Sequence, residues 1–254
     1  MLRRWLKHYD LLIFDRIDST NNEAIRLLKD GVRGNFVIIS RVQTQGKGRR
    51  KKFWQSISGN MHASILLSSD LPLKRLAELS FLTAVAIHHA ITECTHDCKA
   101  PSNDVTLKWP NDVLIGGKKI AGILLESMKI DNRNYVIIGI GVNTHFMPNL
   151  VDRETTSLLN EGIILKNSDD FLSKVMDKFH YYYSKWQKEN SFTMIRNAWM
   201  SHAYRLGAMV SFNDGQQVIS GIFKGIDQNG AIEIELRNSG QIVSFENGQN
   251  LRYE

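Results

Sequence analysis

Cysteine is scarce in this 254-residue sequence, and no apolar run is long enough to cross a bilayer. The two cysteines, Cys94 and Cys98, are too few for a framework of disulfides, so a disulfide-stabilised scaffold is excluded. The N-terminus is basic, but its apolar run from Leu11 to Phe14 is too short for the apolar region of a signal peptide. We therefore expect a reduced, cytoplasmic protein without a membrane partner.

The cysteines raise the question of a metal site, because they bracket His96 and because His88 and His89 lie earlier on the same expected helix. Zinc sites built from these residue types have recognisable ligand spacings, and none of those spacings occurs here. We predict no metal site and interpret the cysteines as a reduced pair at the end of a helix.

The composition is that of a folded, mildly basic protein. Hydrophobic residues make up 43% of the sequence and aromatic residues 9%, which predicts a globular core. The length permits one large domain, or one domain with a small appendage. Lys and Arg (32) exceed Asp and Glu (26), giving a net charge of +6 that favours anionic ligands or partners without selecting one.

Strand and helix patterns alternate through most of the chain. Residues 135–142 (YVIIGIGV) are almost entirely apolar, so this strand is expected near the centre of a sheet. The hairpin expected at residues 113–127 turns at Gly116-Gly117, where a tight turn needs positive φ. The other expected elements are strands at 11–15, 36–42, 61–68 and 105–109 and helices at 19–31, 73–94 and from 168 onward.

After about Tyr204 the sequence changes to short strands separated by Gly, Asn and Asp turns. This pattern predicts a small antiparallel barrel of the SH3-like type. No low-complexity linker precedes it, so the two parts are expected to be closely joined. The predicted fold class is α+β, with domains at residues 1–203 and 204–254.

Three segments carry polar groups that a scaffold alone does not require. The first, TQGKGRRKKFWQ (44–55), has two glycines and five cations within residues 47–52. Its glycines would let backbone N–H groups approach an anion, but no Gly-Lys-Ser/Thr follows, so it is not a Walker loop. Composition alone leaves a solvated basic loop, a phosphate site and a nucleic-acid patch open.

The second segment, KWPNDVLIGGKKIAGILLE (108–126), places Lys108, Asn111, Asp112 and Lys119 around a tight corner and a hairpin. The alternative is an ordinary turn with solvated lysines. The third, GIGVNTH (139–145), has two glycines in an apolar strand, which indicates close approach to the backbone. A bulge or a tight helix–sheet contact remains open there.

In chain order, DSTN (18–21), QTQGKGRR…W (43–54), KWPNDV (108–113), GKKIAGILLE (117–126) and GIGVN (139–143) resemble the motifs of the biotin–protein ligases. The resemblance covers nearly the whole chain and includes NGQNLR (247–252) at the end of the barrel. It implies a class II-synthetase-like mixed sheet backed by helices, followed by the SH3-like barrel. Residues 1–203 would then be the catalytic domain, which binds biotin and ATP.

The resemblance also implies the reaction. Such enzymes use ATP with Mg²⁺ to convert biotin into biotinyl-5′-AMP, and then transfer biotin to a lysine of a biotin carboxyl carrier protein, as in acetyl-CoA carboxylase. ATP–Mg²⁺ and biotin are substrates, and no tightly bound cofactor is expected. Because no helix-turn-helix segment precedes the first strand, we expect the short form of the family, without DNA binding. The resemblance leaves monomer and homodimer open.

Site residues follow from the matched motifs. Lys119, Arg49 and Asp112 are the implied catalytic residues. The implied biotin-binding residues are Ser19, Thr20, Asn21, Gln43, Gly46, Lys47, Gly48, Arg49, Arg50, Lys119, Gly122, Ile123 and Leu124. The implied nucleotide-binding residues are Arg49, Trp54, Asn111, Lys119, Asn143 and Arg252.

The glycine-rich loop departs from the common bacterial pattern Gly-Arg-Gly-Arg-Arg-Gly at two positions. Lys47 stands in place of an arginine and keeps its charge. Lys51 stands in place of a glycine and removes one flexible position, so the closing of this loop is the least predictable part of the site.

Two alternatives belong to other functional classes. A lipoate ligase or octanoyltransferase shares the catalytic fold but lacks the barrel and the KWPND segment. A nucleic-acid-binding protein would need its cations in a broad stripe with stacking aromatics, whereas here they are concentrated in one loop.

Overall fold

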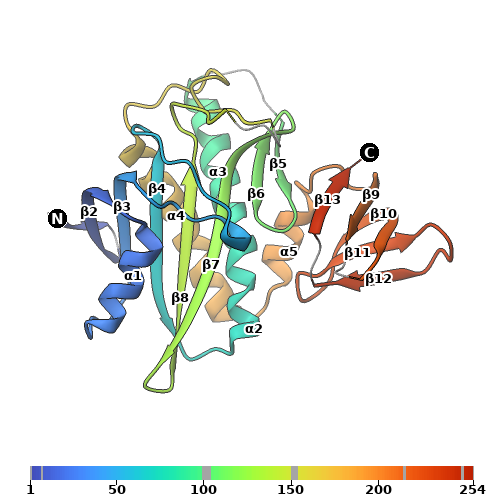
Figure 1. Cartoon of the computed structure of the whole chain (residues 1–254), viewed down its shortest axis with the longest axis horizontal. Coiled ribbons are helices and arrows are strands. Elements are labelled where there is room, and N and C mark those ends of the chain that lie inside the picture. The colour runs from blue at the N-terminus through green and yellow to red at the C-terminus, as the bar shows by residue number, and fades with distance from the viewer. Residues whose placement is uncertain are drawn as a thin grey trace.

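A computed structural model of the chain describes residues 2–6, 8–98, 104–149, 154–213, 216–246 and 249–253. Its larger sheet has eight strands in the order β1-β2-β3-β4-β8-β7-β6-β5 (Figure 1). Strands β2 and β3 run parallel and the other neighbours antiparallel, so the sheet is mixed, as predicted. The strands are β1 (Leu2–Leu6), β2 (Tyr9–Ile17), β3 (Phe36–Gln43), β4 (Met61–Ser69), β5 (Val105–Lys108), β6 (Asp112–Ile115), β7 (Lys118–Ile130) and β8 (Arg133–Val142).

The sequence identified the centre of this sheet correctly. Strand β8 pairs with β4 on one side and β7 on the other, and most of its side chains are buried. The turn between β6 and β7 lies at Gly116 and Gly117, whose φ angles are 56° and 79°. The expected hairpin is therefore confirmed, whereas β1 was not predicted.

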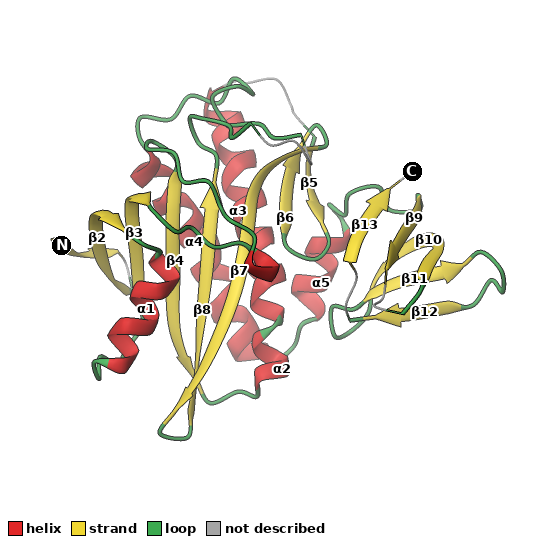
Figure 2. Cartoon of the chain, in the orientation of Figure 1, coloured by secondary structure: helices red, strands yellow, loops and turns green. Residues whose placement is uncertain are grey.

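Four helices cover one face of the sheet (Figure 2): α2 (Leu73–Leu76), α3 (Glu78–Cys98), α4 (Ser168–Glu189) and α5 (Thr193–Met200). The helix predicted over 73–94 is confirmed except at Ala77, where it is interrupted, and α3 continues to Cys98. At the break, the N–H of Ser80 donates to the carbonyl of Ala77, three residues back, so the chain makes a tighter turn there. Helix α5 was not predicted.

Helix α1 (Thr20–Lys29) lies on the opposite face (Figure 1) and packs Ala24 and Leu28 against β2, β3, β4 and β8. It covers only part of that face. The β3–β4 loop crosses the rest, and its short 3-10 turn, η1 (Arg49–Lys51), lies in front of β7 in this view. The candidate site occupies this incompletely covered face.

The C-terminal unit is a five-stranded antiparallel sheet in the order β12-β11-β10-β9-β13, which confirms the expected small antiparallel unit. The side chain of Trp109 donates to Gly230 O at 3.0 Å, and that of Arg196 donates to Ile226 O at 2.6 Å, so the two parts are closely joined. The first two residues of NGQNLR lie outside the described residues. The strands are β9 (Met209–Asn213), β10 (Val218–Ile226), β11 (Ile232–Leu236), β12 (Ile242–Phe245) and β13 (Gln249–Tyr253).

In the described part of the chain, no helix has both the length and the apolar character that crossing a membrane requires. Cys94 is buried and Cys98 is exposed, and both are free cysteines.

Candidate active site

A cavity of about 970 Å³ lies on the sheet face that α1 leaves open. Its lining comes from the start of α1, the β3–β4 loop, the β5–β6 corner, strands β7 and β8, and β13 of the C-terminal unit. Of the predicted site residues, only Gly46 is absent from the lining. The cavity brings together Ser19, Thr20, Asn21, Gln43, Lys47, Gly48, Arg49, Arg50, Trp54, Asn111, Asp112, Lys119, Gly122, Ile123, Leu124, Asn143 and Arg252.

One end of the cavity is neutral and polar. The oxygen Oε1 of Gln43 accepts from the N–H and the hydroxyl of Thr20, at 2.8 and 3.1 Å. Ser64 in turn donates to Thr20 Oγ1 at 2.7 Å. Ser19 is buried at the N-cap of α1, and its side chain caps no helical N–H. These groups present hydrogen-bonding capacity without charge.

The β3–β4 loop folds back on itself as a narrow hairpin. Trp54 N donates to Gly46 O at 2.9 Å, and Gly48 N donates to Lys52 O at 2.7 Å. A Cβ at Gly46 would lie 2.3 Å from Trp54 O, so the two sides of the loop could not approach in this way with any larger residue. The first glycine therefore permits the hairpin itself.

The tip of this loop contains two non-glycine residues in the left-handed region, Arg50 (φ 54°) and Lys51 (φ 60°). Such a conformation costs a non-glycine residue about 1 kcal/mol or more. Lys51, which stands where the bacterial pattern has glycine, is therefore at a position where glycine would be unstrained.

Both glycines of GIGVN make room for side chains of the same chain. A Cβ at Gly141 would lie 2.3 Å from the ring of Trp54, and a Cβ at Gly139 would lie 2.5 Å from Asn21 Oδ1. Close approach to the backbone is thus confirmed. At Gly139 it is the tight helix–sheet contact that the sequence left open, and at Gly141 it is a tryptophan lying on the sheet.

Opposite charges meet at the β5–β6 corner. Lys119 Nζ donates to Asp112 Oδ1 at 2.5 Å, with side-chain exposures of only 13% and 20%. The interpretation of Lys119 as a solvated lysine is therefore wrong. Its ammonium group also lies 5.5 Å from the centre of the Trp54 ring, within the range of a cation–π contact.

Arg49 joins the loop to the same corner, because its Nη1 donates to Asn111 Oδ1 at 3.1 Å. Asn111 Nδ2 donates onward to Ile123 O at 2.6 Å. Burial lowers the pKa of the Arg49 guanidinium, repulsion from Arg50 lowers it further, and Asp112 opposes both effects. An arginine nevertheless stays charged at neutral pH, so Arg49 and Lys119 place two partly desolvated cations beside one cavity.

Asn143 and Arg252 lie at other parts of the cavity. The side chain of Asn143 is buried, and its Nδ2 donates to Thr156 O at 3.0 Å. Its Oδ1 is buried without a hydrogen-bond partner in the described structure, which leaves an acceptor available to a ligand. Arg252 and Leu251 of β13 bring the C-terminal unit into the lining.

Family models match both parts of the chain. Residues 13–143 match the biotin/lipoate A/B protein ligase family, and residues 206–248 match the biotin protein ligase C terminal domain. The biotin--[acetyl-CoA-carboxylase] ligase of Paracoccus denitrificans is 35% identical over 90% of this chain and 95% of its own length. The chain belongs to the biotin protein ligase family.

Further relatives of this family support the assignment. The bifunctional ligase/repressor BirA of Bacillus subtilis is 31% identical, and the match covers 89% of this chain and 69% of that protein. The biotin protein ligase of Aquifex aeolicus, solved in complex with biotin and ATP, is 26% identical with a TM-score of 0.78, over 96% of this chain and 99% of that chain. The predicted enzyme class and fold are confirmed, and the C-terminal match is to the unit that the lipoate alternative would lack.

Glu126, which was not among the predicted site residues, does not line the cavity but contacts two residues that do. Its two carboxylate oxygens accept from Asn21 Nδ2 at 2.7 Å and from Lys47 Nζ at 3.2 Å. Alternate residues of a strand face the same side, so Gly122, Leu124 and Glu126 of β7 share a face. This two-residue alternation along β7 could have identified Glu126 from the sequence. Glu126 connects the start of α1 to the glycine-rich loop.

We expect Glu126→Gln to loosen the loop modestly. The amide can still accept from Asn21, but it carries no charge to attract Lys47. Because partly exposed ion pairs contribute about 0.2–1 kcal/mol, amide exchange at residues 46–49 should quicken by up to roughly fivefold. Hydrogen exchange measured by NMR checks this.

Glu235→Gln is the matched control, because Glu235 has 34% side-chain exposure against 31% for Glu126 and also pairs with a lysine, Lys224. It lies in the C-terminal sheet and should leave the loop unchanged. Equal exchange rates in wild type and Glu126→Gln would show that this carboxylate does not hold the loop.

Proposed function

We propose that this chain activates biotin with ATP–Mg²⁺ to form biotinyl-5′-AMP and pyrophosphate, and then transfers biotin to a lysine of a biotin carboxyl carrier protein. The observation that carries the proposal is that two partly desolvated cations, Lys119 and Arg49, both contact the β5–β6 corner of a cavity whose other end is neutral and polar. A ligand with a neutral polar head and an anionic tail suits that arrangement.

The neutral end suits the ureido ring of biotin. A urea both donates and accepts hydrogen bonds and carries no charge, so it matches the Ser19, Thr20 and Gln43 groups without the desolvation of an ion. Asn21 and Glu126 hold this end of α1 to β7. The backbone of Gly122, Ile123 and Leu124 would contact the rest of biotin, with the carboxylate directed toward Lys119.

The nucleotide would bind on the side of Trp54. Its ring offers a stacking surface for adenine, and the unpartnered Oδ1 of Asn143 can accept from the adenine amino group. Asn111 and Arg252 would contact the phosphates or ribose. The loop residues Gly46, Lys47, Gly48 and Arg50 would close over both ligands, while Mg²⁺ enters with ATP as part of the substrate.

The first step joins two anions, since the biotin carboxylate attacks the α-phosphorus of ATP and pyrophosphate leaves. Two unit charges about 4 Å apart repel by roughly 4 kcal/mol at an effective dielectric constant near 20. Lys119 between the carboxylate and the α-phosphate, with Arg49 beside it, offsets this repulsion. Fixed cations need little reorganisation as the charge moves, so they stabilise the transition state more than water does.

In the second step, the amine of a carrier lysine attacks the acyl carbon, an amide forms and AMP leaves. The attacking amine must be neutral, so a proton has to depart from it. Asp112 lies at the corner beside Lys119 and would orient the incoming lysine. We propose the cytoplasm as the compartment of this reaction, which agrees with two free cysteine thiols.

One assay tests the proposal: purified protein, ATP–Mg²⁺, labelled biotin or labelled lipoate, and a carrier domain. We expect pyrophosphate release that depends on biotin, followed by biotin labelling of the carrier. Lipoate labelling would support the lipoate alternative instead. No release and no labelling with either acid would refute the ligase proposal.

We further predict that the glycine-rich loop, residues 44–54, becomes better protected when both substrates bind. The mixed anhydride is sensitive to water, so a loop that orders over it delays hydrolysis. Hydrogen exchange with and without biotin and a non-hydrolysable ATP analogue measures the change, with residues of β10, none of which line the cavity, as the internal reference. Equal protection of the loop in both states would contradict its closure.

A further inference from the structure

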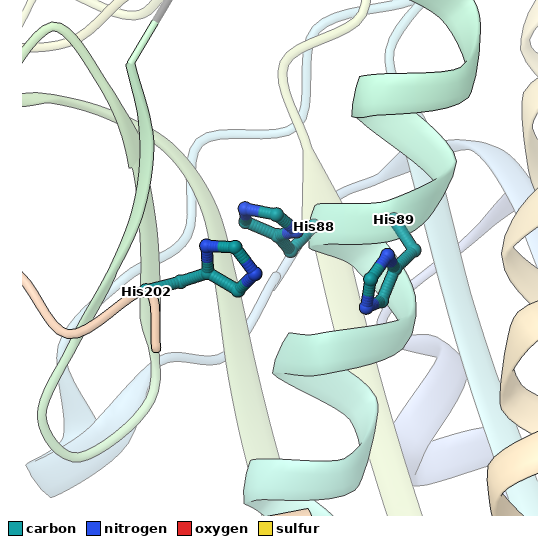
Figure 3. Close-up of side chains that lie close together, drawn as sticks. All are labelled: His88, His89 and His202. Carbon is teal, nitrogen blue, oxygen red and sulfur yellow. The ribbon is translucent and has the colours of Figure 1, made fainter. Parts of the chain in front are cut away.

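Three histidines gather away from the active-site cavity (Figure 3). His88 and His89 are neighbours on α3, and His202 lies in the turn that follows α5. One ring nitrogen of each lies within 4.8 Å of those of the other two. None of the three lines the active-site cavity.

His88 is the fixed member of this histidine cluster. It is only 5% exposed, and its Nε2 lies 3.1 Å from Val105 O. A carbonyl oxygen can only accept, so Nε2 carries the proton and Nδ1 carries a lone pair. That Nδ1 is buried and has no hydrogen-bond partner in the described structure. A buried acceptor without a partner is unfavourable, and a metal ion is one partner that would relieve it.

The other two histidines are half-buried and can adjust. His89 stacks on Tyr182, and His202 stacks on His88 with ring centres 3.8 Å apart. Burial lowers the pKa of all three imidazoles, that of His88 to about 3, so the rings are neutral at pH 7. Neutral imidazole is the form in which histidine binds metals.

We propose that His88, His89 and His202 bind a first-row divalent metal ion of the Zn²⁺ type. Imidazole nitrogen is a preferred ligand of such ions. In tetrahedral geometry, with Zn–N near 2.1 Å, ligand nitrogens lie about 3.4 Å apart. The three ring nitrogens lie within 4.8 Å of one another, so His89 and His202 would have to turn out of their stacks on Tyr182 and His88 to reach that separation around a metal ion.

The surroundings fit this assignment. A metal-bound histidine usually donates its other ring N–H to a carboxylate or a backbone carbonyl, which is the role of Val105 O for His88. His202 also lines a second cavity of about 500 Å³, which offers a path from solvent. Three protein ligands leave one coordination position for water.

The position of the cluster indicates a structural role. The backbone of His202 accepts from Leu107 N at 2.8 Å, and Tyr204 N donates to Leu107 O at 2.9 Å, so this turn is already paired with β5. A bound metal would add a link from the turn to α3. It would therefore fasten the segment that leads into the C-terminal sheet to the main helix of the catalytic part.

Tag-free full-length protein should be titrated with Zn²⁺ alone by calorimetry and with Co²⁺ alone by visible absorption. We expect one saturable site of micromolar or tighter affinity, a rise in Tm with Zn²⁺, and a Co²⁺ spectrum of a low-coordinate nitrogen site. Loss of a hydrogen bond to a metal ligand already costs about 10–100-fold in affinity, so removing a ligand in His89→Ala or His202→Ala should cost at least that much. Both residues are half-buried, so these variants stay informative even if His88→Ala fails to fold.

The matched controls are His96→Ala on the exposed side of α3 and Cys98→Ser near its end. Both should bind Zn²⁺ as wild type does. Absence of saturable binding in the micromolar range would overturn the proposal. So would binding that survives His202→Ala, or binding that is lost in either control, because the metal would then be held elsewhere.

Discussion

Replacing Lys119 with alanine is expected to abolish biotin-dependent pyrophosphate release while the protein remains folded. The substitution removes the cation nearest the proposed meeting point of the two anions, and it leaves Asp112 there without its 2.5 Å partner. Losing one preorganised electrostatic group at a reacting centre costs about 10²–10³ in rate. Because a negative charge then remains in its place, we expect the loss to reach at least the upper value.

Lys118→Ala is the matched control, since Lys118 is the exposed neighbour on the same strand and does not line the cavity. It should keep near wild-type activity. Lys119→Gln adds a variant that can still donate to Asp112 but carries no charge. Wild-type pyrophosphate release in Lys119→Gln would show that the charge of Lys119 is not required for adenylate formation.

Arg49→Gly is expected to release biotinyl-5′-AMP before the carrier arrives, which would label lysines on bystander proteins. Arg49 is the loop residue whose side chain donates to Asn111 at the cavity corner. A hydrogen bond that involves a charged group contributes about 1.5–3 kcal/mol, so the adenylate should dissociate roughly ten- to hundredfold faster. Adenylate dissociation and labelling of an unrelated protein both measure this.

Lys51→Gly separates the role of the Arg49 side chain from the effect of an added glycine. It changes the same loop, removes the same charge and introduces the same residue, but Lys51 is exposed and does not line the cavity. Its φ of 60° also suits glycine. If biotinyl-5′-AMP dissociated from Lys51→Gly as fast as from Arg49→Gly, greater loop flexibility would explain the faster dissociation. The proposed contact of Arg49 with the adenylate would then be wrong.

The sequence predicted correctly those elements whose conformation depends mainly on residues that are close together in the chain. The apolar run of β8 and the Gly116-Gly117 turn depend on neighbouring residues, and both were predicted correctly. The break at Ala77 was not, because apolar residues continue across it and no proline or glycine marks it. Strand β1 and helix α5 were not predicted because both are short and neither shows a long alternation of apolar and polar residues.

The site was predictable as a set of motifs but not as a set of contacts. The glycines of GIGVN indicated that something approaches the backbone, yet only the fold shows that Trp54 and Asn21 do so. His202 is far from His88 and His89 in sequence, so no spacing rule could include it. Contacts between distant segments carry no short-range signal, which is why the motifs indicated chemistry without its geometry.

The hydrogen bond from Trp109 to Gly230 has a consequence for how this enzyme can be divided. Trp109 directly precedes the corner that carries Asn111 and Asp112, so the C-terminal unit supports the turn that holds these two proposed site residues. The boundary predicted near residue 203 would therefore separate two folding patterns but not two parts that work independently. In a chimera that carries the C-terminal sheet of a relative, that sheet would have to place a backbone carbonyl where Gly230 O lies. Without that carbonyl, Trp109 would lose its hydrogen bond and the β5–β6 corner would lose this support.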